Sequence, residues 1–186
     1  NKDGQEYLAF EFKALMPLNA IKMPGRHNAA NALAALALGH AAGLPMEPML
    51  ETLTRFAGLP HRCQWVAAIN GVNYYNDSKG TNVGATLAAV TGLQKDSGKI
   101  VLIAGGVGKG ADFTPLQATA AHLRSVVVIG EDGPQIAAVF EGRVPVHFAS
   151  SMGNAVAIAQ QQAQDGDDVL LSPACASFDM YRGFEH

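Results

Sequence analysis

Four short apolar runs in the last two thirds of the chain restrict its fold more than any other feature. They lie at residues 99–104, 125–129, 144–148 and 168–171. Segments that favour helix separate them, at about residues 83–92, 114–122, 133–140 and 151–163. Continuous apolar strands that alternate with helices are typical of a parallel sheet covered on both faces. We therefore predict an α/β, Rossmann-like fold with helices on both faces of the sheet.

A hairpin adds one antiparallel strand to this sheet. Residues 64–69 and 72–75 both have strand composition, and the dipeptide Asn70-Gly71 joins them. Asn-Gly between two apolar runs strongly indicates a two-residue hairpin turn. The predicted sheet is therefore mostly parallel, with one antiparallel strand.

The first 57 residues have a different character. Apolar and aromatic residues at 7–12 indicate a strand, which we interpret as the end of a sheet whose other strands lie elsewhere. An alanine-rich helix is expected over residues 29–42, capped by Asn28 and well buried because it is apolar nearly all round. A second helix is expected over residues 47–56. Gly58-Leu59-Pro60 then marks a boundary, which predicts domains at 1–57 and 58–186.

Composition excludes several classes of protein. Hydrophobic residues make up 48% of the 186 residues and charged residues 16%, which is typical of a globular protein. A net charge of −3 argues against nucleic acid as a partner. No apolar run is long enough to span a membrane, and two cysteines suit a reducing cytoplasm, where we expect the protein. The chain begins at Asn1 without methionine, and we expect it to be a piece of a longer protein.

A polar stretch at residues 76–82 (Asn-Asp-Ser-Lys-Gly-Thr-Asn) lies between a predicted strand and a predicted helix. Turns of this kind lie at the carboxyl edge of an open α/β sheet, where ligands bind. The helix that follows offers backbone N–H groups and a positive dipole end to an anion. A polar loop with an Asn or Asp cap would look the same on spacing alone.

Residues 105–110 (Gly-Gly-Val-Gly-Lys-Gly) form a second glycine-rich turn. The spacing fits neither the phosphate-binding P-loop nor the dinucleotide pattern G-x-G-x-x-G. Lys109 remains as a cation that could hold a carboxylate or phosphate, although a solvated lysine is the commoner outcome.

Two further segments carry candidate residues. Residues 172–177 (Ser-Pro-Ala-Cys-Ala-Ser) follow the last strand, and their small side chains allow a ligand to come close. Cys175 has no histidine near it in sequence, so a buried structural thiol is expected rather than a nucleophile. His61 and Arg62 stand at the domain boundary, where arginine could grip a phosphate or act as an ordinary surface ion-pair partner. The six histidines show no metal-ligand spacing.

Taken together, these segments resemble the Mur ligase family of ATP-dependent amino-acid ligases, most of all the members that add D-glutamate. The resemblance covers residues 25–184 in the family's order. The segments that carry it are 25–28 with Asn31, 58–62, 76–82, 105–106 with Lys109, Asp112 and Phe113, and 172–177 with Asp179 and Phe184.

The resemblance implies the tail of a central ATPase domain, about residues 1–57, followed by a C-terminal amino-acid-binding domain. It also implies ligation of D-glutamate to UDP-N-acetylmuramoyl-L-alanine through an acyl phosphate, in peptidoglycan precursor synthesis. ATP is the implied cofactor, with Mg²⁺. The implied roles are ATP binding by Asn28, Asn31, Arg62 and Asp77, catalysis by Lys79 and His61, and D-glutamate binding by Thr81, Lys109, Ser177 and Phe184.

The chain also departs from the family pattern. The family's P-loop, its carbamylated lysine and its magnesium-binding Glu and His are expected upstream, so we predict no metal site here and no ligase activity for this chain alone. Gly80 stands where alanine is usual, which we take as a small change. We expect a monomer.

Several alternatives remain. A diaminopimelate- or lysine-adding ligase of the same family is disfavoured because its Asp-Asn-Pro-Arg motif is missing. Folylpolyglutamate synthase shares the architecture but not the turn at residues 172–177. A non-catalytic Rossmann-like module that binds a nucleotide or metabolite is the alternative from another class, and a dehydrogenase cofactor domain is weakened by the missing glycine pattern.

Overall fold

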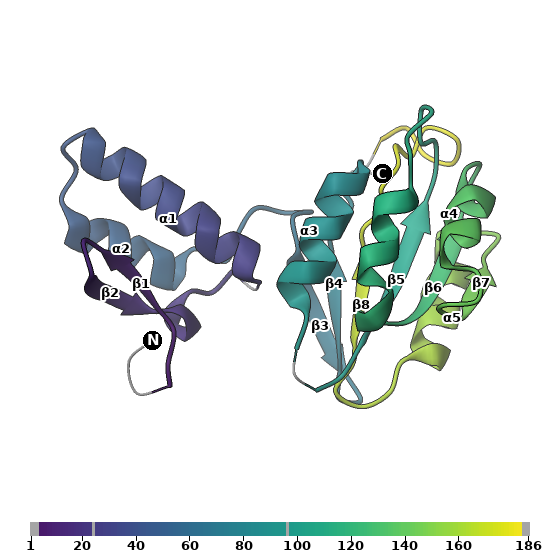
Figure 1. Cartoon of the computed structure of the whole chain (residues 1–186), viewed down its shortest axis with the longest axis horizontal. Coiled ribbons are helices and arrows are strands. Elements are labelled where there is room, and N and C mark those ends of the chain that lie inside the picture. The colour runs from purple at the N-terminus through teal and green to yellow at the C-terminus, as the bar shows by residue number, and fades with distance from the viewer. Residues whose placement is uncertain (1–3, 24, 96, 184–186) are drawn as a thin grey trace. The chain divides into compact units, whose positions relative to one another are not determined.

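A computed structural model describes residues 4–23, 25–95 and 97–183 (Figure 1). The chain divides into two compact units, Asn1–Leu59 and Pro60–His186. The division lies within the Gly58-Leu59-Pro60 segment. The origin of the first unit in a central ATPase domain stays a prediction.

The second unit is built on a six-stranded sheet with the order β3-β4-β8-β5-β6-β7. β3 pairs antiparallel with β4, and every other pair is parallel. The strands are β3 (Gln64–Ile69), β4 (Val72–Asn76), β5 (Ile100–Gly105), β6 (Leu123–Ile129), β7 (Val146–Phe148) and β8 (Asp168–Leu171). This topology confirms the predicted fold. At the β3–β4 turn Asn70 and Gly71 have φ of 51° and 75°, the positive values that a type I′ hairpin needs.

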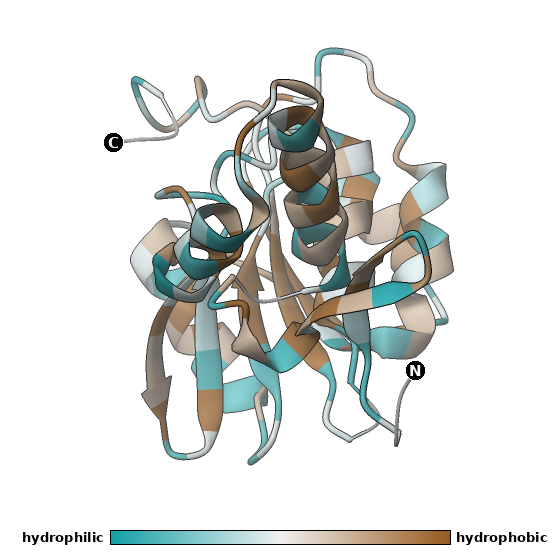
Figure 2. Ribbon diagram, turned by 90° about the vertical axis from the view of Figure 1, so that its left-hand side faces the viewer, coloured by the Kyte–Doolittle hydropathy of each residue, from teal (hydrophilic) through white to brown (hydrophobic). Residues whose placement is uncertain are grey.

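Helices cover both faces of this sheet, as predicted (Figure 1). One face packs against α3 (Val83–Leu93), the 3₁₀ helix η2 (Thr114–His122) and α4 (Gly133–Phe140). The other face packs against α5 (Met152–Gln162). All six residues of β5 are buried, and they alternate between the two faces. The inner strands are accordingly the hydrophobic part of the unit (Figure 2).

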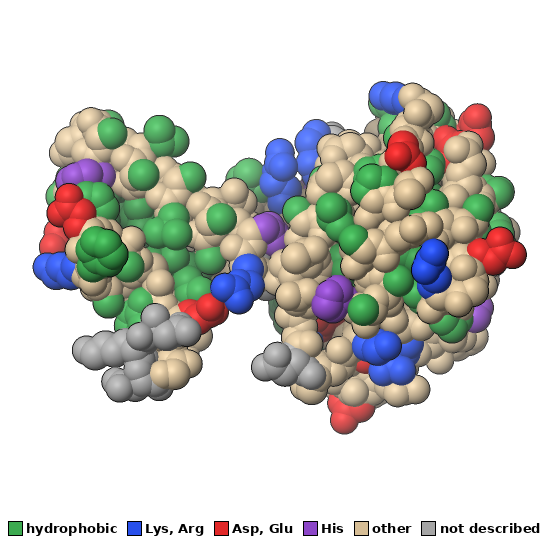
Figure 3. All heavy atoms as spheres, viewed as in Figure 1, with side chains coloured by type: hydrophobic (Ala, Val, Ile, Leu, Met, Phe, Trp, Pro, Cys, Tyr) green, Lys and Arg blue, Asp and Glu red, His purple; other side chains and the backbone are tan. Residues whose placement is uncertain are grey.

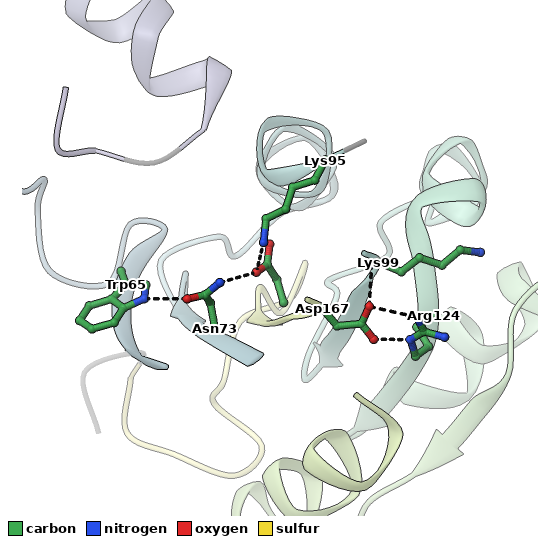
Figure 4. Close-up of polar contacts among 7 residues, drawn as sticks. Trp65, Asn73, Lys95, Lys99, Arg124 and Asp167 are labelled. Carbon is green, nitrogen blue, oxygen red and sulfur yellow. Dashed lines mark hydrogen bonds and ion pairs between the residues drawn. The ribbon is translucent and has the colours of Figure 1, made fainter. Parts of the chain in front are cut away.

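Ion pairs fasten the amino ends of the central strands (Figure 4). The Asp167 carboxylate, fully buried before β8, is paired with the Arg124 guanidinium of β6 and accepts a hydrogen bond from the Lys99 backbone N–H before β5 at 2.8 Å. The carboxylate of the next residue, Asp168, accepts hydrogen bonds from the Lys95 ammonium at 2.5 Å and from the Asn73 amide at 3.2 Å. These contacts fix the strand register at the edge opposite the predicted site.

The first unit has a small core. The elements of this unit are β1 (Tyr7–Phe10), β2 (Lys13–Pro17), a 3₁₀ turn η1 (Leu18–Ala20), α1 (Arg26–Ala41) and α2 (Met46–Arg55). The predicted strand at 7–12 was too long, because Glu11 and Phe12 have positive φ and turn the chain back. β1 therefore pairs antiparallel with β2, so a partner strand that we expected elsewhere lies in the same unit.

α1 differs from its prediction in two ways. It begins at Arg26 after an N-cap Gly25, so Asn28 lies inside the first turn and does not cap the helix. Only Ala32 and Leu36 of this helix are buried, whereas Leu33 and Leu38 are 40% and 73% exposed. The prediction of a well-buried helix was therefore wrong for the described residues, since only one stripe of the helix packs on α2 and the hairpin. Apolar side chains remain visible on this unit's surface (Figure 3).

Among the described residues, no helix combines the length and the hydropathy that are needed to span a lipid bilayer.

Candidate functional site

Three turns meet at the carboxyl edge of the sheet, and residues 172–177 join the other two. The Ala174 N–H donates to the Gly80 carbonyl at 2.9 Å, and the Gly105 N–H donates to the Pro173 carbonyl at 2.9 Å. Val107 and Ala176 exchange two backbone hydrogen bonds, of 2.7 and 3.0 Å. The segments that carry Thr81, Lys109 and Ser177 are thus joined directly by hydrogen bonds, as a shared site requires.

Asp77 anchors the first of these turns from inside. Asp77 is 7% exposed, and its carboxylate accepts hydrogen bonds from the Cys63 backbone N–H at 3.0 Å and the Ser172 hydroxyl at 2.7 Å. The Asp77 N–H in turn donates to the Leu171 carbonyl at 2.8 Å. Both carboxylate oxygens are therefore engaged within the protein. The predicted contact between Asp77 and ATP stays a prediction.

Gly80 is tightly enclosed by the same group. A Cβ atom on Gly80 would lie 2.4 Å from Asp77 Oδ2 and 2.6 Å from Ser172 Oγ. An alanine at this position requires those side chains to move. The difference from the family pattern is therefore larger than we expected from the sequence.

His61 is held by the polar stretch that begins at Asn76, the last residue of β4. Its backbone N–H donates to Gln64 Oε1 at 3.1 Å, and its carbonyl accepts from the Lys79 N–H at 3.1 Å. Its Nδ1 lies 3.0 Å from Ser78 Oγ and 3.2 Å from Asn76 Nδ2. These bonds hold His61 at a φ of 62°, which is unusual for a residue other than glycine. The two predicted catalytic residues, His61 and Lys79, are thus coupled through the backbone.

A cavity of about 360 Å³ opens at this edge. We call it the carboxyl-edge cavity. Among the predicted site residues it is lined by His61 and Ser177. Asn76, Ser78 and Tyr181 also line it, and the sequence assigned them no role. The polar composition of residues 76–82 pointed to the first two; nothing in the sequence singled out Tyr181.

Among the predicted site residues, Arg62, Lys79 and Lys109 are exposed cations on the segments around this cavity. Lys109 has a φ of 55°, and its ammonium lies 5.5 Å from the centre of the Phe178 ring. A cation held over a ring is partly ordered yet remains open to an anion.

The remaining predicted residues lie elsewhere. Asn28 and Asn31 belong to the first unit, where Asn31 Nδ2 donates to Asn28 Oδ1 at 3.3 Å. Phe184 lies outside the described residues. The roles predicted for Asn28, Asn31 and Phe184 therefore stay predictions.

Both thiols are structural. Cys63 and Cys175 are buried and free, which confirms the expectation of a buried thiol at 175. Burial, and then the Asp77 carboxylate, raise the pKa of Cys63 to about 12. Burial likewise raises the pKa of Cys175 to about 12, with smaller contributions from Asp132 and Asp179. Such thiols are poor nucleophiles at neutral pH.

The chain is similar to curated proteins over almost its whole length. The chain is 57% identical over 185 residues to the UDP-N-acetylmuramoylalanine–D-glutamate ligase of Pseudomonas putida, an alignment that covers 98% of this chain and 41% of that protein. It is 54% identical over 186 residues to the ligase of the same name from Pseudomonas aeruginosa, covering 99% of this chain and 42% of that protein. The chain thus spans about two fifths of the length of these curated relatives.

Solved structures share the fold at low sequence identity. A UDP-N-acetylmuramate–alanine ligase from Thermotoga maritima matches with a TM-score of 0.66 and 20% identity over 88% of this chain and 37% of that one. A bifunctional folylpolyglutamate synthase/dihydrofolate synthase from Yersinia pestis matches with a TM-score of 0.67 and 22% identity over 89% of this chain and 40% of that one.

A family model decides the classification. The model described as the Mur ligase, glutamate ligase domain, matches residues 61–175, which is most of the second unit. The chain therefore belongs to the Mur ligase family.

Proposed function

We propose that this chain forms the amino-acid-binding part of an ATP-dependent ligase that joins D-glutamate to UDP-N-acetylmuramoyl-L-alanine. The observation that supports this most is the convergence of the three turns through residues 172–177. It sets Thr81, Lys109 and Ser177 on neighbouring segments, which provides two hydroxyls and a cation for a small dicarboxylate. The relatives that match nearly the whole chain carry the name of a D-glutamate ligase.

In this proposal the second unit binds and orients the incoming amino acid. Lys109 pairs with a carboxylate of D-glutamate, and the Thr81 and Ser177 hydroxyls donate to its carboxylate oxygens. Fixing the amine beside the activated carboxyl group of the uridine substrate supplies rate acceleration by orientation. Phe184 is proposed as a further contact to D-glutamate.

The described residues fit ATP in part. Arg62 and Lys79 are exposed cations that suit phosphate oxygens, and we propose that they contact ATP together with Asp77, Asn28 and Asn31. ATP when bound supplies the phosphoryl group that activates the acid, and Lys79 and His61 stabilise negative charge beside it. The described residues contain no group of three or more His, Cys, Asp or Glu that could hold a metal. We propose that Mg²⁺ accompanies ATP and is held by residues outside those that the structure describes. We also propose a monomer in the cytoplasm.

Nuclear magnetic resonance tests the D-glutamate site on this chain directly. We expect D-glutamate at millimolar concentration to shift the backbone amide resonances of Thr81, Lys109 and Ser177, with L-glutamate much weaker. Lys109→Gln should weaken binding at least tenfold, since it removes the cation. Lys99→Gln, a matched change at the opposite edge of the sheet, should leave binding unchanged. Equal shifts with both enantiomers, or none at saturation, would refute the assignment.

A second test concerns the chain alone. We expect no phosphate release from ATP when the chain is mixed with D-glutamate and UDP-N-acetylmuramoyl-L-alanine, because the family's phosphate-binding loop lies outside it. Turnover above background would contradict this expectation.

A further inference from the structure

We propose that Asn76 and Ser78 fix the tautomer of His61, holding the neutral ring with its proton on Nε2. His61 then acts towards a ligand of the carboxyl-edge cavity as a hydrogen-bond donor through Nε2. The tautomer follows from the geometry alone, whereas its use in ligand binding rests on the proposed function. Asn76 and Ser78 are positioning residues in this proposal.

The argument starts from the orientation of the Asn76 amide. One end of this amide lies 3.0 Å from the backbone N–H of Ser78. A backbone N–H can only donate, so this end must be the oxygen, Oδ1. The other end is therefore the NH₂ group, and it lies 3.2 Å from His61 Nδ1.

The amide orientation decides the state of the imidazole. An NH₂ group can only donate, so His61 Nδ1 must offer a lone pair to accept from it. The Ser78 hydroxyl, 3.0 Å from the same nitrogen, can rotate its proton towards Nδ1 and share this single lone pair with the amide. A proton on Nδ1 would face the Asn76 NH₂ protons directly. The neutral ring therefore carries its proton on Nε2.

The backbone keeps the ring in this position. The His61 N–H is bonded to Gln64, and the His61 carbonyl is bonded to the Lys79 N–H. These bonds hold the His61 backbone at a left-handed φ of 62°, and the contacts of Nδ1 to Asn76 and Ser78 then restrict rotation of the side chain. The same stretch, residues 76–79, thus fixes both the placement of the ring and its protonated nitrogen.

This state limits what His61 can do chemically. With Nδ1 turned towards Asn76 and Ser78, Nε2 is the ring nitrogen that can face a ligand. It can donate Nε2–H to an anionic oxygen, and a preformed donor of this kind stabilises charge without reorganising. Carboxylate and phosphate oxygens are the ligand chemistry that fits.

Long-range ¹H–¹⁵N spectra of the histidine rings test the tautomer in this chain. The His61 signals are assigned by their loss in His61→Gln. We expect the pattern of a neutral ring protonated at Nε2. Asn76→Asp should move the proton to Nδ1, because a carboxylate there accepts where the amide donated, while the Ser78 N–H keeps its acceptor. Asn70→Asp, the same change in the exposed β3–β4 turn, should leave the pattern unaltered.

Each outcome is decisive. A wild-type ring protonated at Nδ1, or an Asn76→Asp ring still protonated only at Nε2, would overturn the proposal. If Asn76→Asp does not fold, Ser78→Ala provides the second test, with a shift of the Nδ1 resonance expected and the proton still on Nε2. No change at Nδ1 in a folded Ser78→Ala protein would count against the network.

The ligand half of the proposal has a separate readout. Titration with ATP and, separately, with D-glutamate should move the Nε2 resonance with at least one of them, more than the Nδ1 resonance. If either ligand shifts other resonances of the chain but not that of His61 Nε2, His61 is not a donor to the ligand, whereas the proposed function stands. Absence of all binding shifts with the tautomer as expected would instead refute the function.

Discussion

At the residue scale, Asp77 shows how a motif residue can serve the fold directly. Its buried carboxylate is the acceptor for the Cys63 N–H and the Ser172 hydroxyl. Asp77→Ala leaves both donors without an acceptor, so we expect a loss of about 3 kcal/mol in the free energy of unfolding. Urea denaturation measures it, with the exposed Ser150→Ala as a control within about 0.5 kcal/mol of wild type. A loss below about 1 kcal/mol would mean that Asp77 does not anchor the turn.

The thiols give a second prediction at this scale. With a pKa of about 12, Cys63 and Cys175 are almost entirely protonated at pH 8, with roughly one thiolate in ten thousand thiols. We expect neither to react with iodoacetamide in the native protein within an hour, and both to react in 8 M urea. Mass spectrometry of the alkylated peptides reads this out. Rapid labelling of native Cys175 would show that it is accessible and activated.

Residue roles were the least predictable feature from the sequence. The polar stretch 76–82 indicated a site but not which side chains hold the turn and which face the cavity. That division depends on contacts between residues as far apart as Asp77 and Ser172, which no local pattern contains. For the same reason the enclosure of Gly80 was not foreseen.

At the scale of elements, the Arg124–Asp167 pair joins the starts of β6 and β8. Burial raises the pKa of the Asp167 carboxyl, but hydrogen bonds from Arg124, and then from the Gln164 and Lys99 amides, bring it below the ordinary 3.8. A group with a lowered folded-state pKa stabilises the fold above its unfolded pKa. That stabilisation is lost as the pH falls through the folded value.

Removing this carboxylate should therefore be costly at neutral pH. We expect Asp167→Asn to lower the free energy of unfolding by about 3 kcal/mol at pH 7, because it leaves the Arg124 charge without its partner. The difference in the free energy of unfolding between this variant and the wild type should become smaller below pH 4. Asp165→Asn, an exposed neighbour, is the control for chemical denaturation. A constant gap between pH 7 and pH 3 would contradict the linkage.

The bounds of elements that lie between strong turn residues were predictable from the sequence, and other features were not. The strands at 64–69 and 168–171 and the helix at 133–140 have the predicted bounds, because each lies between strong turn residues. The helix predicted over residues 114–122 also has the expected bounds, and it is of the 3₁₀ type, which periodicity does not distinguish from an α-helix over nine residues. The hairpin at 7–17 was missed because its turn uses Glu11 and Phe12 rather than glycine or asparagine.

At the scale of the whole molecule, the two units have separate cores. Leu36 packs with Leu8, Met16 and Leu53 in the first unit. Leu170 lies in the large cluster between the sheet and its helices in the second. No core residue of one unit appears in the other's described clusters, so we expect the units to respond separately to truncation.

Two matched substitutions test this separation. Leu36→Ala and Leu170→Ala each remove the same buried atoms, at a cost of about 2–5 kcal/mol, so each should destabilise its own unit. Hydrogen-exchange mass spectrometry should show faster exchange only in peptides from residues 4–59 for the first variant, and only from residues 60–183 for the second. Because the second unit buries far more apolar side chains, its wild-type peptides should exchange more slowly than those of the first. Acceleration across both units by either variant would show that they unfold as one cooperative body.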